Sequence, residues 1–548
     1  FITDWWLSPE VYLKRPARGT YWRLDQILKR KAVSSRFVAR AALGINSEYS
    51  KRTLMDLHPN IKVMRHPDHV ASVIFLWAHH EKMVAIDQSV AFVGGLDLAF
   101  GRWDDSNYRL FDVMESQTAG EACDEVDLSC NMLLWLGKDY SNFIQKDWTQ
   151  LDQPFQDNVD RTHVPRIPWR DLGVAVHGKA ARDLARHFIQ RWNFTKKKYK
   201  ATFYPYLLPK SHTTADELPF TVPGTAKASV QVLRSVDHWS AGTCECSIHK
   251  AYVDIIENST QVLVCVCVSA CVSACRVFSF AVQSSKLKVC VCACSEKQKY
   301  RVFVVIPLLP GFEGDISEGG GNAIRAILHF TYRTINRGKN SILSRLKEQM
   351  QDEWTQYISL CGVRTHSELG HTPISELIYV HSKALIADDR RYIIGSANIN
   401  DRSMMGYRDS ELAVLVEDEE RVPSDERRRG PAGGRFRTPR SRYRRPSHGG
   451  KWGDSMLQLP PPLAPQVFRC LPSDSIHNLR ELQEHTAAEE VRAIRGILVH
   501  FPLHFLCEEN LLPPAVSKEG WFLWTSGHSG LADRKTPPHP HPINKLNK

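Results

Sequence analysis

The sequence predicts an α/β fold that contains a duplicated element. Short apolar runs typical of strands alternate along the chain with helix-like segments. A pattern of the form H-x-K-x4-D occurs twice, at His80–Asp87 and His381–Asp388. At 548 residues the chain is also long enough for more than one domain. These observations together indicate two related halves rather than one repeated motif in an unrelated background.

The expected elements follow from the apolar pattern. Strand-like runs lie near 71–78, 82–86, 90–94, 230–234, 301–307, 376–386 and 391–395. Helix-like segments lie between or after them, at 180–193, 247–257, 322–334 and 341–352. This alternation of strands with helices is typical of an α/β fold.

Each copy of the pattern predicts a strand pair that carries an imidazole and an ammonium group on one face. Residues i and i+2 of a strand face the same side, so His80 and Lys82 project together. The same spacing holds for His381 and Lys383. An apolar run, a turn and a second apolar run then follow in both copies, which is typical of a hairpin.

The downstream part of each copy matches as well. The second apolar run ends at a small pair, where glycine lets the backbone pass close to a ligand, and these residues are Gly94, Gly95, Gly395 and Ser396. A short polar residue follows two positions later, Asp97 in one copy and Asn398 in the other. We expect Asp87 and Asp388 to fix strand and turn geometry rather than to touch a substrate.

Two such half-sites fit the cleavage of a phosphate diester. That reaction needs cations for the phosphate oxygens, a nucleophile and an acid for the leaving oxygen. Two halves together supply two histidines and two lysines, whereas one half supplies too little. One histidine must be neutral to attack and the other protonated to donate, so their environments must separate the two pKa values. No metal is expected, because the lysines supply the positive charge.

A carboxylate normally holds a catalytic histidine in one tautomer. Asp112 follows His80 at nearly the distance at which Glu411 follows His381, so we expect these two pairs. The alternatives for the first pair are Asp104 and Asp105.

At these residues the chain resembles the phospholipase D family with two H-x-K-x4-D motifs. It is most similar to the eukaryotic phosphatidylcholine-specific enzymes, and among them to the mammalian type-two isoform. Longer stretches carry the same resemblance, namely Ile2–Glu10, Gly94–Asp97, Trp135–Tyr140, Pro307–Ser317 and Gly395–Ser403. The likeness covers most of residues 1–261, 300–418 and about 466–520.

The resemblance implies a fold and a reaction. The fold would have two pseudo-twofold-related halves, each with a mixed sheet flanked by helices, and the active site between them. Phosphatidylcholine would be hydrolysed to phosphatidic acid and choline, or its phosphatidyl group passed to a primary alcohol, through a phosphohistidine. His80 would be the nucleophile and His381 the acid and then the base, an order that the residues alone leave open. The phosphate contacts would be Lys82, Lys383, Ser396 and Asn398.

We divide the chain into a first catalytic half, a second catalytic half, a disordered segment and a C-terminal region with a disordered tail, at 1–228, 229–418, 419–465 and 466–548. The segment 419–465 is rich in Arg, Pro and Gly, a composition typical of disorder. Residues 262–298 are rich in Cys and Val and stand where the family has a different segment. We interpret them as an aberrant insertion rather than as a membrane span or a metal site. The chain between Phe37 and Leu43 is shorter than in the family, which predicts a lost core strand.

The net charge of +11 suits an anionic surface, whether membrane or nucleic acid. In the resembling enzymes a polybasic site binds phosphatidylinositol 4,5-bisphosphate, the expected activating lipid. The matching basic residues here are Arg186, Arg191, Lys196, Lys197 and Lys198, although a solvated helix face is the alternative. The resemblance further implies no cofactor for the chemistry, a membrane phospholipid substrate, small GTPases as partners, and a cytoplasmic, peripheral membrane location.

Two other functions stay open at this point. One is a nucleic-acid phosphodiesterase of the same superfamily, which the resemblance disfavours. The other is a catalytically inactive, phosphoinositide-binding scaffold. The chain begins with Phe1 inside a family motif, so we expect a fragment; no signal peptide pattern is visible.

Overall fold

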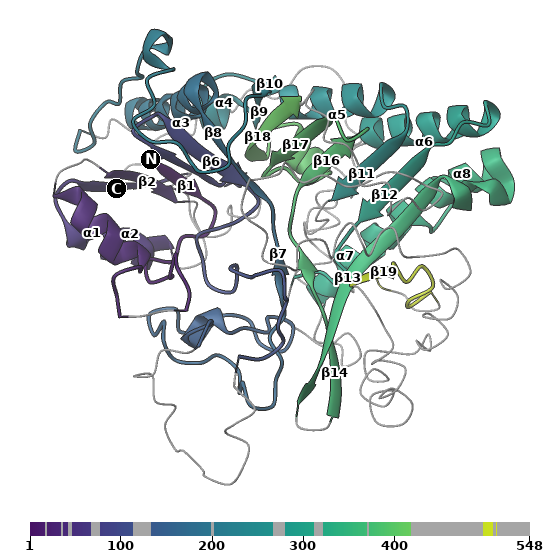
Figure 1. Ribbon diagram of the computed structural model, residues 1–548, viewed down its shortest axis with the longest axis horizontal. Coiled ribbons are helices and arrows are strands. Elements are labelled where there is room, and N and C mark those ends of the chain that lie inside the picture. The colour runs from purple at the N-terminus through teal and green to yellow at the C-terminus, as the bar shows by residue number, and fades with distance from the viewer. Residues whose placement is uncertain are drawn as a thin grey trace, which may run out of the picture.

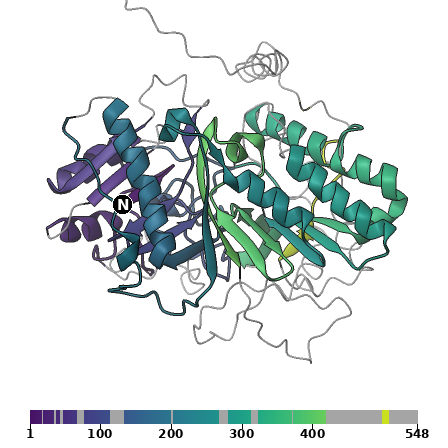
Figure 2. The ribbon, with the colours of Figure 1, turned by 90° about the horizontal axis from the view of Figure 1, so that it is seen from above.

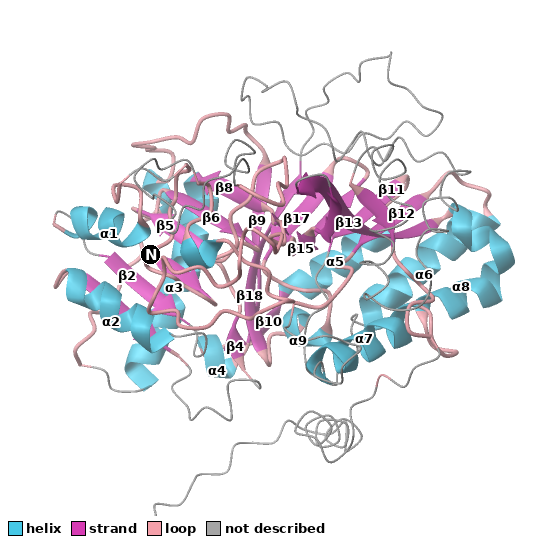
Figure 3. Cartoon of the chain, turned by 90° about the horizontal axis from the view of Figure 1, so that it is seen from below, coloured by secondary structure: helices cyan, strands magenta, loops and turns pink. Residues whose placement is uncertain are grey.

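The structure is a computed structural model that describes residues 1–16, 19–33, 37–41, 47–66, 77–112, 133–198, 202–266, 280–311, 322–369, 372–417, 497–507 and 511. Two halves lie side by side, the first coloured purple to blue and the second teal to green (Figures 1 and 2). Strands form a central band and helices cover its outer sides (Figure 3). The predicted α/β fold is therefore confirmed.

The first half contains a six-stranded sheet in the order β3-β2-β1-β5-β6-β8. Its strands are β1 (Ile2–Asp4), β2 (Phe37–Ala41), β3 (Ile61–Arg65), β5 (Met83–Ile86), β6 (Val90–Gly94) and β8 (Gly173–His177). The helices are α1 (Leu24–Ala32), α2 (Ser47–Leu57) and α3 (Gly178–Lys198). The expectation of a lost core strand near Phe37 is wrong, because β2 lies between β1 and β3 and is parallel to both.

The second half contains a sheet in the order β10-β9-β18-β17-β16-β11-β12-β13-β14. Its strands are β9 (Ser229–Val236), β10 (Glu245–Cys246), β11 (Val262–Val266), β12 (Arg301–Val305), β13 (Ile358–Leu369), β14 (Thr372–Leu377), β16 (Ala384–Ala387), β17 (Arg391–Gly395) and β18 (Asp409–Glu417). Its helices are α4 (His238–Ala241), α5 (Ser247–Glu257), α6 (Phe280–Ser295), α7 (Asn322–Ile335), α8 (Ile342–Met350) and α9 (Asp401–Met404). The largest apolar core lies between this sheet and α5, α6, α7 and α8.

The two sheets repeat one topology. In each, three parallel strands (β3-β2-β1 and β13-β12-β11) continue into an antiparallel trio (β5-β6-β8 and β16-β17-β18). Both motif hairpins turn through two residues with positive φ, a two-residue turn that suits the twist of the strands: Asp87 and Gln88 at 51° and 54°, and Asp388 and Asp389 at 54° and 53°. The carboxylate of Asp388 also accepts the backbone N–H groups of Gln261 and Val262, where β11 begins. Both motif aspartates therefore lie in turns, away from the histidines.

The described parts of residues 262–298, which the sequence analysis interprets as an aberrant insertion, lie within the second half. Strand β11 lies in the middle of the second sheet, parallel to β12 and antiparallel to β16. Cys265 is fully buried on this strand, and Cys290 of α6 is buried in the same core. The apolar residues Val262–Val266 are thus typical of a strand buried on both faces. Residues 267–279 lie outside the described residues.

Other expectations had mixed outcomes. The predicted strand at 376–386 is divided among β14, β15 (Tyr379–Val380) and β16. Most of the predicted strand at 71–78, the whole segment 419–465 and most of 466–548 lie outside the described residues. The short strand β19 (Leu498–His500) nevertheless pairs with β13, and Phe501 joins the core of the second half. Within the described part of the chain, no helix combines the length and apolarity needed to cross a membrane.

Candidate active site

One short strand from each half pairs with the opposite half, and a motif histidine follows each of these strands directly. Strand β4 (Ala78–His79) runs parallel to β18 of the second half, and β15 runs parallel to β7 (Trp169–Arg170) of the first. The backbone N–H of His80 then donates to the carbonyl of Ser410 at 3.0 Å, and that of His381 to the carbonyl of Arg170 at 2.8 Å. Each histidine is thus fixed against the opposite half.

The next residue on each opposite strand is a carboxylate that contacts the histidine. His80 Nδ1 lies 2.9 Å from Glu411 Oε1, and His381 Nδ1 lies 2.8 Å from Asp171 Oδ2. Both carboxylates are buried. A histidine that donates Nδ1–H to a carboxylate keeps Nε2 for the reacting atoms. The two halves therefore exchange their orienting carboxylates.

This exchange corrects the pairing expected from the sequence. Glu411 orients His80 rather than His381. Asp112 instead accepts from the Arg161 guanidinium at 3.1 Å and from the Trp135 N–H at 3.2 Å. The alternatives for His80 are engaged elsewhere, Asp104 with Arg166 and Asp105 with Arg109.

Sequence reasoning missed Asp171 altogether, because the signal for it lies in the strand register. Asp171 stands two residues before Gly173, which pairs with Gly94. Glu411 stands two residues before Ala413, which pairs with Gly395. The two carboxylates are therefore equivalent, but only once β8 and β18 are known to pair with the motif hairpins.

The small pairs make room for these carboxylates. A Cβ at Gly95 would overlap the carboxylate of Asp171 and lie 3.0 Å from the carbonyl oxygen of His381. At the equivalent position Ser396 donates its hydroxyl to Glu411 and accepts the N–H of Leu412. We expected Ser396 to contact phosphate, but the structure places its hydroxyl on the orienting carboxylate instead. Gly94 and Gly395 likewise leave no room for a side chain against the neighbouring strand.

The two lysines hold equivalent positions with different neighbours. Lys82 Nζ donates to the carbonyl of His80 at 2.7 Å, and Lys383 Nζ to that of His381 at 2.6 Å. Lys82 also lies 3.1 Å from the buried carboxylate of Asp97. In the second half the corresponding polar residue is Asn398, which is buried and uncharged.

Burial and nearby charges shift the pKa values of Asp97 and Lys383. Burial alone would raise the pKa of Asp97, but the charge of Lys82, a hydrogen bond with Asp4 and the charge of Arg102 together outweigh it and lower that pKa. Burial lowers the pKa of Lys383 to about 7. Lys82 is thus paired with a buried carboxylate, whereas Lys383 can lose its proton near neutral pH.

The imidazoles respond to the same field. Burial, followed by the charges of Lys82 and Lys383, holds the pKa of both His80 and His381 well below the usual range. Because both lysines act on both rings, the two half-sites form one electrostatic centre. Burial also raises the pKa of Glu411 to about 7 and that of Asp171 to about 6. A phosphate diester would add a negative charge beside the two lysines of this centre.

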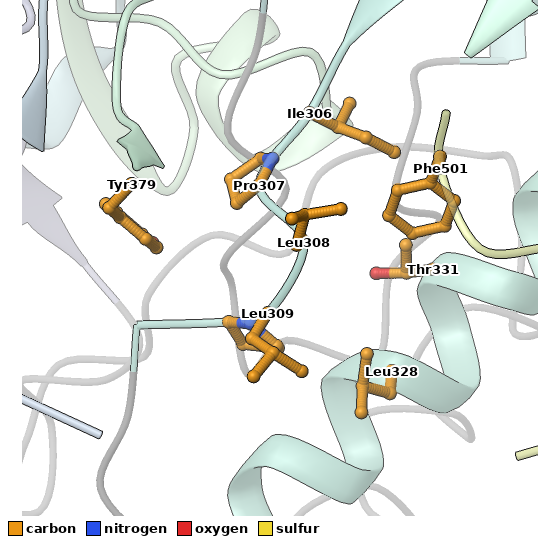
Figure 4. Close-up of a pocket in the computed structure, with 9 residues that line it drawn as sticks. Ile306, Pro307, Leu308, Leu309, Leu328, Thr331, Tyr379 and Phe501 are labelled. Carbon is orange, nitrogen blue, oxygen red and sulfur yellow. The ribbon is translucent and has the colours of Figure 1, made fainter. Parts of the chain in front are cut away.

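Aromatic rings line both sides of the centre. Trp5 meets the His80 ring edge-on at 5.9 Å, and Trp169 lies 4.8 Å from the His381 ring. Tyr379 stacks at 6.2 Å from His381 and also lines an apolar pocket with Ile306, Pro307, Leu308, Leu309, Leu328, Thr331 and Phe501 (Figure 4). That pocket adjoins the reacting groups but contains none of them.

The basic residues of helix α3 that were predicted to bind lipid are not all exposed to solvent. Arg191 is fully buried and pairs with Glu81, the residue between His80 and Lys82. The Glu81 carboxylate also lies 3.2 Å from Nε2 of His187. The expectation that Arg191 contacts a lipid is therefore wrong in this structure. Lys197 and Lys198 are exposed, and Arg186 and Lys196 are partly exposed.

One group of described residues could hold a metal ion, and it includes no member of the histidine–carboxylate pairs.

A sequence profile of the family described as Phospholipase D matches residues 140–271 and 285–437, just over half of the chain. Phospholipase D2 of Bos taurus is 52% identical over 572 residues, which cover 95% of this chain and 61% of that protein. Phospholipase D1 of Homo sapiens is 44% identical over 694 residues, covering 95% of this chain and 64% of that protein.

The chain thus spans between three fifths and two thirds of the length of these curated relatives. Among solved structures, the phosphatidylserine synthase of Haemophilus influenzae covers 76% of this chain and 76% of its own, with 12% sequence identity and a TM-score of 0.40.

Proposed function

Since the chain belongs to the phospholipase D family, as its two motifs predicted, we propose that it is a phospholipase D that hydrolyses phosphatidylcholine to phosphatidic acid and choline. The observation that carries this proposal is the exchange of carboxylates, which gives two oriented imidazoles and two lysines in one centre. Two oriented histidines are what a double displacement at one phosphorus needs. The identity to Phospholipase D2 supports the phospholipid substrate.

In the proposed first step, Nε2 of neutral His80 attacks phosphorus and forms a P–N bond. The P–O bond to choline breaks, and protonated His381 gives its Nε2 proton to the leaving oxygen. In the second step His381 takes a proton from water, whose oxygen attacks phosphorus. The P–N bond breaks and phosphatidic acid leaves; a primary alcohol in place of water gives the transphosphatidylation product.

The charges of the centre support this sequence of steps. Without substrate both histidine pKa values are low, which suits the nucleophile but not the acid. The negative phosphate diester would offset the charges of Lys82 and Lys383, and this would raise the pKa of His381 toward the range in which it can donate. The two lysines would also stabilise the charge that builds on the phosphate oxygens.

The membrane part of the proposal rests on fewer residues than the sequence offered. The exposed Lys197 and Lys198, with the partly exposed Arg186 and Lys196, would bind phosphatidylinositol 4,5-bisphosphate at the cytoplasmic surface of a membrane. Arg191 is excluded from this contact set by its burial. Small GTPases stay a predicted class of partner to which no residue is assigned.

The test is choline release from phosphatidylcholine vesicles that contain phosphatidylinositol 4,5-bisphosphate. We expect turnover by the parent chain and its loss, by at least about a thousandfold, in His80→Asn and His381→Asn. Lipid binding without turnover in the parent would favour the scaffold instead. Cleavage of DNA but not of lipid would favour the nucleic-acid phosphodiesterase.

A second measurement fixes the order of the histidines. A substrate with a nitrophenol leaving group does not need an acid for its departure, so His381→Asn should accumulate the covalent adduct on His80. Mass spectrometry of the trapped chain locates the phosphorus. The assigned roles would be reversed if His80→Asn accumulated an adduct on His381 and His381→Asn accumulated none on His80.

A further inference from the structure

We propose that Asp237, His238 and Cys244 form a binding site for a divalent transition-metal ion, with Zn²⁺ as the best match. This site is separate from the histidine–carboxylate pairs and plays no part in the proposed reaction. Each residue offers one ligand atom, and these three atoms all lie within 4.8 Å of one another. They are exposed or partly exposed, so an ion can reach them from solvent.

The donor set selects the kind of metal. One thiol sulfur, one imidazole nitrogen and one carboxylate oxygen suit Zn²⁺, whereas Mg²⁺ and Ca²⁺ prefer oxygen ligands throughout. Three protein ligands leave a fourth tetrahedral position for water. The expected site is therefore an open, exchangeable one rather than a closed structural site.

The local fold brings the three ligands together. Asp237 caps the short helix α4 in a reciprocal capping box with Ser240, and the helix ends at Gly242 with φ of 75°. The Cβ of any other residue at Gly242 would crowd the ring of Phe194 at 3.0 Å. The chain therefore reverses at Gly242, and Cys244 returns to the start of the helix, where its Sγ lies 2.7 Å from Asp237 Oδ1. Strand β10 then fixes the returning chain against β9.

Metal binding at this site has a defined proton balance. The Cys244 thiol donates to the Asp237 carboxylate, and this hydrogen bond raises the pKa of the thiol. When the ion binds, the S–H bond breaks, a sulfur–metal bond forms, and one proton passes to the buffer. The neighbouring titratable and charged groups are Asp237, His238, Cys246 and the Arg234–Glu245 ion pair.

The site also has a structural consequence. Between its ligands lies Trp239, whose ring packs 4.8 Å from that of His79, the residue before His80. His79 in turn is hydrogen-bonded to His66 and to Ser410. An ion held by Asp237, His238 and Cys244 would fix the turn that carries Trp239, and would therefore stabilise the packing behind the first motif.

The experiment uses the full, untagged chain and titrates it with Co²⁺, a spectroscopic substitute for Zn²⁺. We expect a thiolate-to-cobalt absorption band that saturates at one equivalent and is removed by added Zn²⁺. Cys244→Ser and His238→Gln should each lose that equivalent. The matched control is Cys507→Ser, which removes another exposed cysteine and should keep the band.

A thermal melt gives an independent measurement. Zn²⁺ should raise the melting temperature of the parent and of Cys507→Ser, but not that of Cys244→Ser or His238→Gln, and all four should melt alike without metal. The absence of a band in the parent would overturn the proposal. So would a full equivalent of bound Co²⁺ in Cys244→Ser, since the thiolate would then come from another part of the chain. Neither outcome depends on choline release, so it leaves the proposed reaction to its own test.

Discussion

The two halves of the active site share a backbone and differ in charge. In both, a two-residue turn, a small pair and a crossing strand place a histidine and a lysine in the same way. The first half adds Asp97 beside Lys82, whereas the second has Asn398 at the corresponding position. The duplicated fold therefore fixes where the groups stand, and single residues give each lysine a different neighbour.

The difference also appears around the orienting carboxylates. Gly95 contributes only space beside Asp171, whereas Ser396 donates a hydrogen bond to Glu411. Each imidazole consequently depends on a different environment, supplied by the opposite half. A duplicated site can thus become asymmetric without any change of fold.

Removing the exchanged carboxylates should have the largest effect on activity. We expect Asp171→Asn and Glu411→Gln each to reduce the rate of choline release by about 10²–10⁴-fold, because the histidine loses its tautomer and its support. Asp105→Asn, at the partly exposed alternative, is the control and should stay within a few-fold of the parent. NMR titration of the ring of His381 should change far more in Asp171→Asn than in Glu411→Gln. A larger change in Glu411→Gln would refute the exchange.

Breaking the buried ion pair between Arg191 and Glu81 should have a large effect on stability. Arg191→Met leaves Glu81 buried without its cation, which we expect to reduce the free energy of unfolding by about 3–5 kcal/mol. Arg186→Met on the same helix should change it by no more than about 0.5 kcal/mol. Denaturant melts measure both. Unchanged stability with weakened vesicle binding in Arg191→Met would restore the lipid-contact role that we rejected.

The charge difference between the halves can be reversed. Asn398→Asp should place a carboxylate in the second half, as Asp97 does in the first, and should weaken inhibition by inorganic phosphate about tenfold at neutral pH. Asp97→Asn frees Lys82 from its partner and should strengthen that inhibition. Inhibition constants from choline-release assays test both changes. Equal inhibition in all three chains would mean that these residues do not set the charge of the centre.

The last prediction is a pH dependence of stability. The folded state lowers the pKa of Lys383 from 10.5 to about 7, so between these pH values the unfolded chain binds more protons than the folded one. Stability from this group therefore rises with pH across that window, by up to about 1.4 kcal/mol per unit. Subtracting the melts of Lys383→Met from those of the parent isolates the slope. A difference that stays flat, or falls as pH rises, would contradict the lowered pKa.

Local pattern was enough to predict the motif hairpins and helix α5, because their periodicity and spacing are contained within short stretches of chain. Asp171 could not be found in that way, since its role depends on β8 pairing with β6. Glu411 was identified as a site residue but assigned to the wrong ring, because nothing local shows that β4 crosses to β18.

Strand β11 was not among the strands predicted from the sequence, for a different reason. Its alternation of Val and Cys continues beyond Val266 and obscures the short apolar run, which is typical of a strand buried on both faces. Arg191 shows the converse error: a basic residue on a basic helix was assigned to the surface, although a carboxylate in the adjacent motif neutralises it inside the protein.

Because β4 and β15 cross between the halves, each half of this chain depends on the other to orient its histidine. If the polypeptide were cut near residue 229, each fragment would keep one complete H-x-K-x4-D string and lose the acid that steadies its imidazole. Activity would then be a property of the reassembled pair, and its recovery would depend on the concentration of both fragments, as in any complementation between separately inert pieces.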